Sequence, residues 1–309
     1  MIKEAKIYVA GHGGLVGSGI MGKLAQDSYK NIIYRTSREL DLRDQVAVNQ
    51  FFATEQPEYV FLAAAKVGGI LANKTYPGQF IYDNLMIQAN VIHGAYTYGV
   101  KKLLFMGSSC IYPKYAPQPI KEEYLLTGEL ESTNEAYAIA KIAGIKMCQA
   151  YNRQYNTNFI AVMPTNLYGP NDNFDLTSSH VLPALIRKFH EAKINQHSSV
   201  EIWGTGKPRR EFLHVDDLAA SCIFLMDNDD NGDLINLGVG RDICIADLVK
   251  IISKVVGYSG DIVYNTAMPE GTPCKLLDIS KITTLGWQPK IGLEEGIHST
   301  YQWYTKHYV

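Results

Sequence analysis

Short apolar runs alternate with longer amphipathic stretches through the first half of this 309-residue chain. The runs are apolar on both faces, which is typical of strands buried on both sides of a sheet. Predicted strands occupy residues 6–10, 31–35, 59–65, 102–107 and 158–163. Predicted helices lie between them, at residues 14–28, 44–55, 78–98 and 134–155. Strands that alternate with helices in this way indicate an α/β fold with a doubly wound parallel sheet.

The alternation weakens after the stretch MPTNLYGPNDNFD, where glycine, proline and asparagine become frequent. We place the main boundary at residues 164–175 and expect, beyond it, a helix over 178–193 and a strand that ends at Trp203. A chain of this length can form one large domain with a smaller partner. The expected division is a first domain over 1–165 and a smaller C-terminal α/β domain over 166–309, some of whose segments return to the first.

A glycine-rich turn follows the first predicted strand and opens the first predicted helix. The stretch GHGGLVGSGI carries the pattern GxxGxxG at Gly11, Gly14 and Gly17. Glycine at such positions permits a tight turn, a close approach of the backbone to a pyrophosphate and close packing of helix on sheet. The amino terminus of the helix then faces the phosphates. Because a strand precedes the pattern and a helix follows it, we favour a dinucleotide-binding (Rossmann) site over a plain turn.

The end of the second predicted strand indicates which dinucleotide binds. NAD-dependent proteins usually carry an acidic residue there, which bonds the ribose hydroxyls. This chain has the stretch YRTSREL, so Arg35 and Arg38 could pair with a 2′-phosphate. We therefore predict NADP, while the alternative that both arginines are solvated surface residues stays open. Asp41 and Leu42 follow closely and could flank the adenine.

A tyrosine and a lysine stand four residues apart in the stretch NEAYAIAKIAG. Tyr137 and Lys141 share one face of a predicted helix. An ammonium group near a phenol lowers the phenol pKa from about 10, so that the phenol can act as an acid near neutrality. Tyr98 and Lys102 match the same spacing, but Gly99 and the start of a strand separate them. The first pair is therefore the predicted catalytic pair.

The fourth predicted strand ends in the stretch GSSCIYPK. Ser108, Ser109 and Cys110 therefore emerge at the carboxyl end of the sheet, where doubly wound folds bind ligands. A serine hydroxyl at this place can donate a hydrogen bond to a substrate carbonyl that Tyr137 also contacts. This pair of donors would polarise the carbonyl for hydride attack.

Charge and cysteine content exclude several other functions. A net charge of -2 and a pI near 6.4, without long basic runs, argue against binding to nucleic acid or to an acidic membrane surface. The five cysteines include no CxxC pair, which argues against a disulfide framework or a metal site and favours a reducing, cytoplasmic location. The most apolar stretch, YVFLAAAKVGGIL, is too short to span a bilayer. The first strand begins so early that no leader is expected.

Several stretches together resemble the extended short-chain dehydrogenase/reductases. They are GHGGLVG, AAAKVGGI, GSSCIYPK, YAIAKIAG, MPTNLYGPNDNF, SSHVLPAL and PRREFLHVDD. More narrowly they resemble the branch that epimerises and reduces a GDP-4-keto-6-deoxy sugar, and the resemblance extends from Gly11 to about Trp287. It implies an NADP(H)-dependent enzyme with a GDP-sugar substrate. It also implies a homodimer, with helices 78–98 and 134–155 at the interface.

The resemblance assigns roles residue by residue. It implies Ser108, Tyr137 and Lys141 as the reductase residues, with Cys110 and His180 as the acid/base pair of the epimerase. The resemblance implies cofactor contacts in the segments 11–17, 106–109 and 164–167. Together with the residues after the second strand, the predicted cofactor contacts are Gly11, His12, Gly13, Gly14, Leu15, Val16, Gly17, Arg35, Arg38, Asp41, Leu42, Met106, Gly107, Ser108, Ser109, Tyr137, Lys141, Pro164, Thr165, Asn166, Leu167 and His180. The implied substrate contacts are Ser108, Cys110, Asn166, Lys188, Trp203, Arg210 and Glu270. Some bacterial members carry arginine at the positions of Gly13 and Ser37, so NADP preference here rests on Arg35 and Arg38.

The implied reaction explains why a thiol and an imidazole are needed. A ketone at C4 of the sugar acidifies the hydrogens on C3 and C5, and inverting each centre requires a base on one face and an acid on the other. Tyr137 and Ser108 are committed to the ketone oxygen. Cys110 and His180 have ordinary pKa values of about 8.5 and about 6.5, close enough to neutrality to exchange protons with carbon acids.

Other interpretations stay open. A nucleotide-sugar epimerase or dehydratase that retains NAD shares the glycine turn and the YxxxK spacing, although dehydratases typically carry an Asp-Glu pair where this chain has Ser109 and Cys110. A non-catalytic NADP(H)-binding module is the other alternative. Taken singly, Cys110 could be a small core residue, His180 a helix cap and Trp203 a packing residue.

Overall fold

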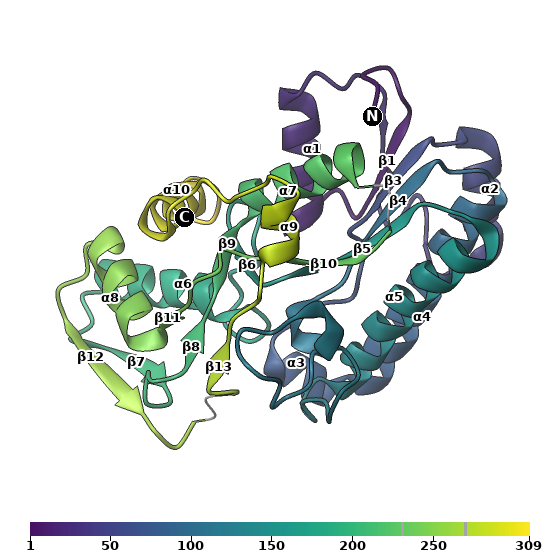
Figure 1. Ribbon diagram of the computed structural model, residues 1–309. Helices are drawn as coiled ribbons and strands as arrows, with labels where there is room; N and C mark the ends of the chain where they lie inside the picture. The colour runs from purple at the N-terminus through teal and green to yellow at the C-terminus, as the bar shows by residue number, and fades with distance from the viewer. Residues whose placement is uncertain (230–231, 269–270) are drawn as a thin grey trace.

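The computed structural model describes residues 1–229, 232–268 and 271–309, and within them a parallel sheet of six strands forms the centre of the larger part (Figure 1). Its strands, in spatial order, are β10 (Leu234–Leu237), β5 (Phe159–Pro164), β4 (Lys102–Met106), β3 (Tyr59–Leu62), β1 (Ile7–Ala10) and β2 (Ile32–Ile33). Each neighbouring pair runs parallel. The predicted doubly wound α/β class is confirmed.

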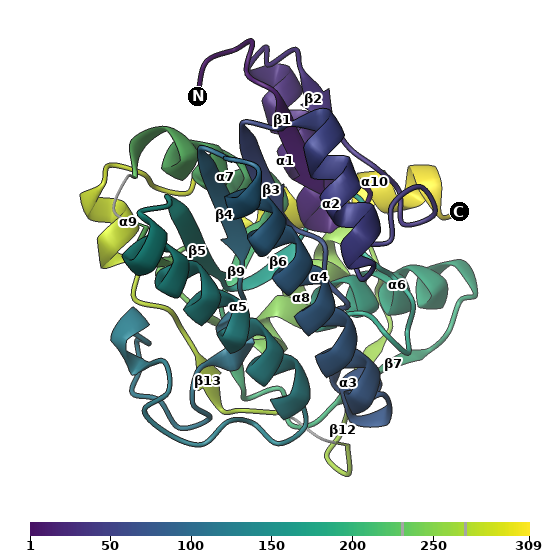
Figure 2. The same cartoon turned by 90° about the vertical axis from the view of Figure 1, so that its right-hand side faces the viewer.

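Helices cover both faces of this sheet because successive strand residues point to opposite sides. Tyr8 and Ala10 of β1 belong to one core, and Ile7 and Val9 belong to the other. On the first face lie α2 (Gln45–Glu55), α4 (Pro77–Thr97) and α5 (Glu135–Tyr155), and Figure 2 shows α4 and α5 side by side. On the second face α1 (Leu15–Gln26) packs against α7 (Val215–Asn228).

The smaller part lies on the left-hand side of Figure 1 and has a core of its own. Its helices are α6 (Val181–Ile194), α8 (Ile245–Val256) and α10 (Leu293–His307). In the described part of the chain, its strands form small sheets: β7 (Ser199–Trp203) with β12 (Asp261–Asn265), β6 (Asn166–Tyr168) with β9 (Phe212–His214), and β11 (Ile243–Cys244) with β8 (Arg209–Arg210) and β13 (Cys274–Lys275).

The chain crosses between the two parts more than once. After β9 it returns through α7 to the second face of the large sheet, and β10 extends that sheet beside β5. Short elements complete the path: α3 (Ile70–Thr75), η1 (Ser109–Ile111), η2 (Glu122–Tyr124) and α9 (Ser280–Thr284), the last packed on β10. Within the described residues, no helix is long and apolar enough to cross a bilayer.

Three predicted elements differ clearly at their ends, and the first of them, the strand expected over 59–65, already ends at Leu62. The helix expected over 178–193 begins only at Val181, because the Asp175 carboxylate accepts hydrogen bonds from the backbone of Thr177 and Ser178 and closes a turn first. The strand expected over 31–35 pairs only at Ile32–Ile33, at the edge of the sheet. Such differences at element ends leave the topology unchanged.

Candidate active site

The strands β1, β4 and β5 all end at one edge of the large sheet, because they run parallel. The predicted cofactor segments 11–17, 106–109 and 164–167 directly follow or complete these strands. The structure therefore brings together three segments whose outermost residues, Gly11 and Leu167, are 156 positions apart in sequence. This edge is where a doubly wound sheet binds ligands.

The glycine turn is closed on its inner side and open on its outer side. Gly11 has a φ of +86°, and a Cβ there would lie 2.6 Å from the Ala64 nitrogen. A Cβ at Gly17 would lie 2.0 Å from the Gly11 oxygen. Around Gly13, by contrast, a Cβ would meet no atom within 4 Å in the described structure. The turn thus has the shape of a cradle in front of the α1 amino terminus, which fits the pyrophosphate of a dinucleotide.

The two arginines after β2 differ in their surroundings. Arg35 donates to the Glu55 carboxylate at 2.5 Å and to the Tyr34 carbonyl at 2.8 Å. Arg38 is exposed, and among the residues described it forms no hydrogen bond or ion pair. Arg38 is therefore ready to meet a phosphate, whereas Arg35 would have to share its guanidinium with Glu55.

Three other predicted cofactor contacts lie close to these arginines. The His12 ring contacts the Tyr34 ring with 4.3 Å between centroids, and its buried Nδ1 has no hydrogen-bond partner in the described structure. The Asp41 carboxylate accepts from Arg43 at 2.8 Å, and these bonds hold the pKa of Asp41 below its usual value. Leu42 is half-buried against the core. The Asp41 carboxylate is thus already paired with the Arg43 guanidinium.

The predicted catalytic serine lies at the turn between β4 and η1. Its Oγ accepts a hydrogen bond from the Cys110 nitrogen at 3.2 Å and lies near enough to the Tyr137 phenol to lower the pKa of that phenol. The α5 helix packs against η1, and Asn134 at the start of α5 donates to the Cys110 carbonyl at 3.2 Å. Ser108, Cys110 and Tyr137 are therefore neighbours, as the sequence predicted.

The electrostatics of the tyrosine differ from the expectation. Burial raises the pKa of Tyr137, the charge of Cys110 raises it further, and the hydrogen bond from Ser108 lowers it. Lys141 instead donates to the Met106 carbonyl at 2.7 Å, and burial lowers the pKa of this ammonium to about 7. The predicted lowering of the phenol pKa by Lys141 is wrong for this arrangement, because the lysine is turned toward the end of β4.

The cysteine has a cationic neighbour that the sequence analysis missed. Lys275, in β13, donates to the Cys110 sulfur at 3.1 Å. Burial raises the pKa of Cys110, but Lys275, the hydrogen bond with Ser108 and the charge of Arg210 together bring it below its usual value. Cys110 is half-buried and so remains accessible to solvent. No local spacing signals Lys275, since a lysine in the stretch PCKLLD is unremarkable on its own.

The predicted histidine caps the amino end of α6. His180 stands at the N-cap position without a side-chain capping hydrogen bond, and it is exposed to solvent. Desolvation lowers its pKa, and the charge of Lys275 lowers it further. The segment before it is held in place by a hydrogen bond from the Gly69 nitrogen to the Ser178 carbonyl at 2.9 Å. Lys275 thus acts on both members of the predicted acid/base pair.

The predicted substrate contacts lie mostly in the smaller part. The Lys188 ammonium lies 5.4 Å from the centre of the Trp203 ring and donates to the Glu201 carbonyl. Trp203 is 47% exposed and forms an open aromatic surface. Arg210 is paired in register with Lys275 across β8 and β13. Glu270 lies outside the described residues.

The segment after β5 joins the two parts. Thr165 and Asn166 both donate to the Glu211 carbonyl, at 3.2 and 2.7 Å. Leu167 packs against the core on the second face of the sheet, as Val16 does. The remaining predicted cofactor contacts are Leu15 at the start of α1, Met106 and Pro164 at the ends of β4 and β5, and Gly107 and the buried Ser109 directly after β4.

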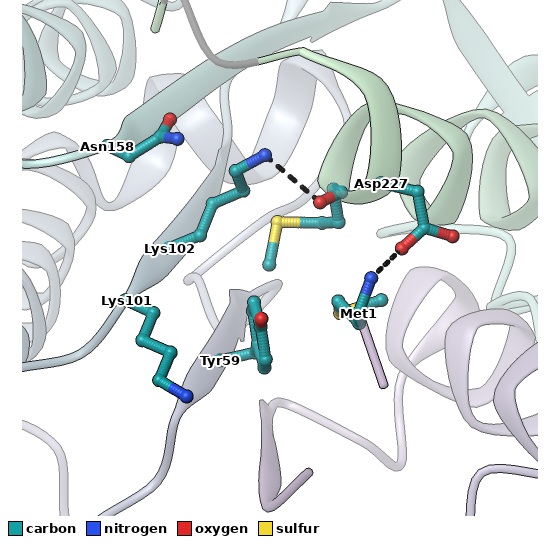
Figure 3. A pocket seen from close by; sticks show the side chains of 7 residues that line it. Met1, Tyr59, Lys101, Lys102, Asn158 and Asp227 are labelled. Atoms are coloured by element: carbon teal, nitrogen blue, oxygen red, sulfur yellow. Dashed lines mark hydrogen bonds and ion pairs between the residues drawn. The ribbon is translucent and has the colours of Figure 1, made fainter. Parts of the chain in front are cut away.

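A hollow of about 260 Å³ lies at the opposite edge of the sheet, away from all these residues (Figure 3). It is lined by Met1, Tyr59, Lys101, Lys102, Asn158, Met226 and Asp227. The Met1 amino group bonds Asp227, and Lys102 donates to the carbonyls of Met226 and Asp229. Lys102 therefore supports the end of α7, and its YxxxK match with Tyr98 is structural.

Comparisons with known proteins agree with this geometry. Residues 7–238 match the NAD dependent epimerase/dehydratase family. The chain is 60% identical to a putative GDP-L-fucose synthase 2 of Arabidopsis thaliana, over 99% of this chain and 94% of the relative. It is 53% identical to the GDP-L-fucose synthase of Escherichia coli (strain K12), over 98% and 97%. The structure is similar to that of a GDP-L-fucose synthetase from Naegleria fowleri bound to NADP, with a TM-score of 0.94, 31% identity, and coverage of 100% and 95%.

Proposed function

The chain belongs to the NAD dependent epimerase/dehydratase family, and from its site we propose that it converts GDP-4-dehydro-6-deoxy-D-mannose to GDP-L-fucose with NADPH. The reaction combines epimerisation at C3 and C5 with reduction of the C4 ketone. One observation carries the proposal: the hydroxyls of Ser108 and Tyr137, suited to a ketone oxygen, lie beside a half-buried cysteine whose sulfur accepts a hydrogen bond from Lys275. A dehydrogenase needs only the serine and tyrosine hydroxyls, whereas an epimerase also needs a group such as the cysteine that exchanges protons with carbon.

We propose that Cys110 and His180 serve the two carbons beside the ketone. One of them removes the proton from one face of the sugar, and the other returns a proton to the opposite face, so each inversion swaps one proton between enzyme and substrate. Both groups then exchange with water. The lowered pKa of Cys110 favours the thiolate, which is the form that accepts a proton.

Tyr137 and Ser108 act on the ketone oxygen. Because the ordinary pKa of a phenol is about 10 and burial raises that of Tyr137 further, the phenol is protonated at neutral pH and can donate its proton to the oxygen. The Ser108 hydroxyl stabilises the phenolate that is left. Lys141, with a pKa of about 7, lies at the end of β4, where it can hold or release a proton at the base of the site.

The residues that would hold NADP(H) lie around the glycine turn. Gly11 and Gly17 shape the cradle for the pyrophosphate, and Arg38 is the exposed cation for the 2′-phosphate. When bound, reduced nicotinamide supplies the hydride for C4. Thr165 and Asn166 are anchored to Glu211 at the neighbouring strand end and line the same edge of the sheet.

The proposal also covers which part of the chain binds each ligand and how two chains assemble. Residues 1–165, together with α7, β10 and α9, would bind NADP(H), and the smaller part would bind the GDP-sugar through Lys188, Trp203 and Arg210. We propose a homodimer through α4 and α5, because Tyr82, Ile139 and Tyr155 are large apolar side chains exposed on these helices. All five cysteines carry free thiols, which supports a cytoplasmic location.

The decisive experiment follows both halves of the reaction at once. The protein is incubated in deuterated water with GDP-4-dehydro-6-deoxy-D-mannose and NADPH, while the reduced-nicotinamide absorbance is recorded. The proposal expects oxidation of NADPH and a product that carries deuterium at both C3 and C5. Cofactor oxidation without label would show a simple 4-reductase. Tightly bound NAD in the purified protein, with no net oxidation, would instead show an epimerase or dehydratase that retains its cofactor.

A further inference from the structure

We propose that Lys275 is a positioning residue that holds Cys110 as a thiolate and keeps the sulfur in place for proton transfer; this inference rests on the proposed function. The direct observation is the bond from the Lys275 Nζ to the Cys110 Sγ, at 3.1 Å. The two residues are separated by 165 positions in the sequence and belong to different parts of the molecule. Lys275 is thus delivered to the cysteine by the tertiary structure.

The backbone around Lys275 is fixed from two sides. On one side β13 runs beside β8, with Lys275 opposite Arg210. On the other side the Gln118 side chain accepts from the Leu276 nitrogen at 2.8 Å, and the Leu276 carbonyl accepts from the Ile120 nitrogen, also at 2.8 Å. A strand held on both edges cannot shift easily, so the lysine reaches Cys110 from a rigid base.

A buried glutamate completes this frame. Glu211 is fully buried, and its carboxylate accepts backbone hydrogen bonds from Val239 at 2.6 Å, Gly240 at 2.7 Å and Leu277 at 3.0 Å. It follows Arg210 directly in the chain. One carboxylate therefore ties the strand that carries Lys275 to the strand that carries Arg210, and both cations act on Cys110.

The charges around Cys110 stabilise the ionised sulfur and oppose the effect of burial. The groups that face the sulfur are Lys275, Arg210, Ser108 and Tyr137. The charge of Lys275 also acts on His180. Two of the four groups are cations, Ser108 is a hydrogen-bond partner, and Tyr137 is a neutral phenol at neutral pH, since its ordinary pKa is about 10 and burial raises it further. Burial alone would favour the neutral thiol. If the nearest cation is removed, burial is no longer opposed by its charge, so the pKa of Cys110 should rise.

The test measures the thiolate without using the reaction. Iodoacetamide alkylation of Cys110 is followed against pH by peptide mass spectrometry in the wild type, Lys275→Met and Lys275→Arg. Methionine keeps much of the side-chain volume and removes the charge, whereas arginine retains it. We expect the alkylation pKa of Lys275→Met to rise by about one unit or more, as for loss of a close opposite charge, and Lys275→Arg to remain near the wild type. Cys244, half-buried and bonded to Asp247, is the internal control in each digest.

Two results would overturn the proposal. An unchanged alkylation pKa in Lys275→Met would show that the lysine does not hold the thiolate. Equal upward shifts in both variants would show that the charge is not responsible. Because alkylation requires no sugar substrate, either result is independent of whether the proposed reaction occurs. As a second readout, the acidic limb of the pH profile for deuterium entry at C3 and C5 should move upward in Lys275→Met and stay in place in Lys275→Arg.

Discussion

The Nζ of Lys141 lies 2.7 Å from the carbonyl oxygen of Met106, so a buried lysine supports the end of the central strand β4. The side chain is 3% exposed and lies over the ring of Phe105. This contact places the lysine below the turn that carries Ser108 and Cys110. It also gives the lysine a measurable effect on stability.

Lys141→Met should raise stability while it lowers activity. The folded pKa of Lys141 is about 7, below the value near 10.5 of an unfolded chain, so the unfolded state binds more protons between these two pH values. Burying the charged form therefore destabilises the wild type fully below pH 7, and this effect fades as the pH rises toward about 10.5. The variant should show its largest gain in Tm at and below pH 7. A gain that grows with pH would contradict the assignment.

Tyr137→Phe should abolish reduction and leave proton exchange. The substitution removes the phenol that donates to the ketone oxygen but keeps the ring, which contacts Phe80 with 6.4 Å between centroids. Loss of a general acid typically lowers the rate by about 10²- to 10⁴-fold. NADPH oxidation should fall by this factor, while label from deuterated water still enters C3 or C5. Tyr98→Phe, at the structural YxxxK match, is the matched control and should keep full activity.

Cys110→Ser should slow deuterium entry by a similar factor, about 10²- to 10⁴-fold, because a hydroxyl is a far weaker base near neutrality. Label at C3 and C5 is measured by mass spectrometry of the recovered sugar. Cys274→Ser is the control, since that thiol is also half-buried but bonds Asp242 and Gln118. If Cys110→Ser exchanges as fast as the wild type, the epimerase role of the cysteine is wrong.

Gly17→Ala should weaken cofactor binding, whereas Gly13→Ala should not. A Cβ at Gly17 would lie 2.0 Å from the Gly11 oxygen, so the turn must deform, and forced overpacking typically costs about 1–3 kcal/mol. The Kd for NADPH, measured by fluorescence titration, should rise and Tm should fall. Around Gly13 a Cβ meets nothing within 4 Å in the described structure. Equal effects of the two substitutions would contradict the difference between a closed inner side and an open outer side of the turn.

Arg38→Ser should reduce the preference for NADPH over NADH. A charge-assisted hydrogen bond contributes roughly 1.5–3 kcal/mol, so the KM for NADPH should rise about tenfold or more. The KM for NADH should stay unchanged, because NADH has no 2′-phosphate. Arg43→Ser is a matched control, since Arg43 is an exposed arginine engaged by Asp41 and Asp83. If only Arg43→Ser reduced the preference for NADPH, Arg43 and not Arg38 would be the residue that binds the 2′-phosphate.

Much of the fold was predictable because the signals are local. The apolar runs of β1, β3, β4 and β5 and the amphipathic helices between them are readable within windows of about twenty residues. Parallel strands must then end at one edge, which places Ser108 beside the glycine turn without any knowledge of side-chain packing. The ends of elements were less predictable, since a single turn such as that closed by Asp175 delays the start of α6.

The sequence by itself determined the doubly wound sheet, the glycine turn and the succession of Ser108, Cys110 and Tyr137, because each depends on spacing along one stretch of chain. The tertiary structure decided which cation meets which group. Lys141 turns to the Met106 carbonyl, Arg35 to Glu55, and Lys275 reaches Cys110 across 165 positions. Such pairings depend on how separate strands and loops pack, and a lysine or arginine side chain can reach several partners, so no local pattern specifies its choice.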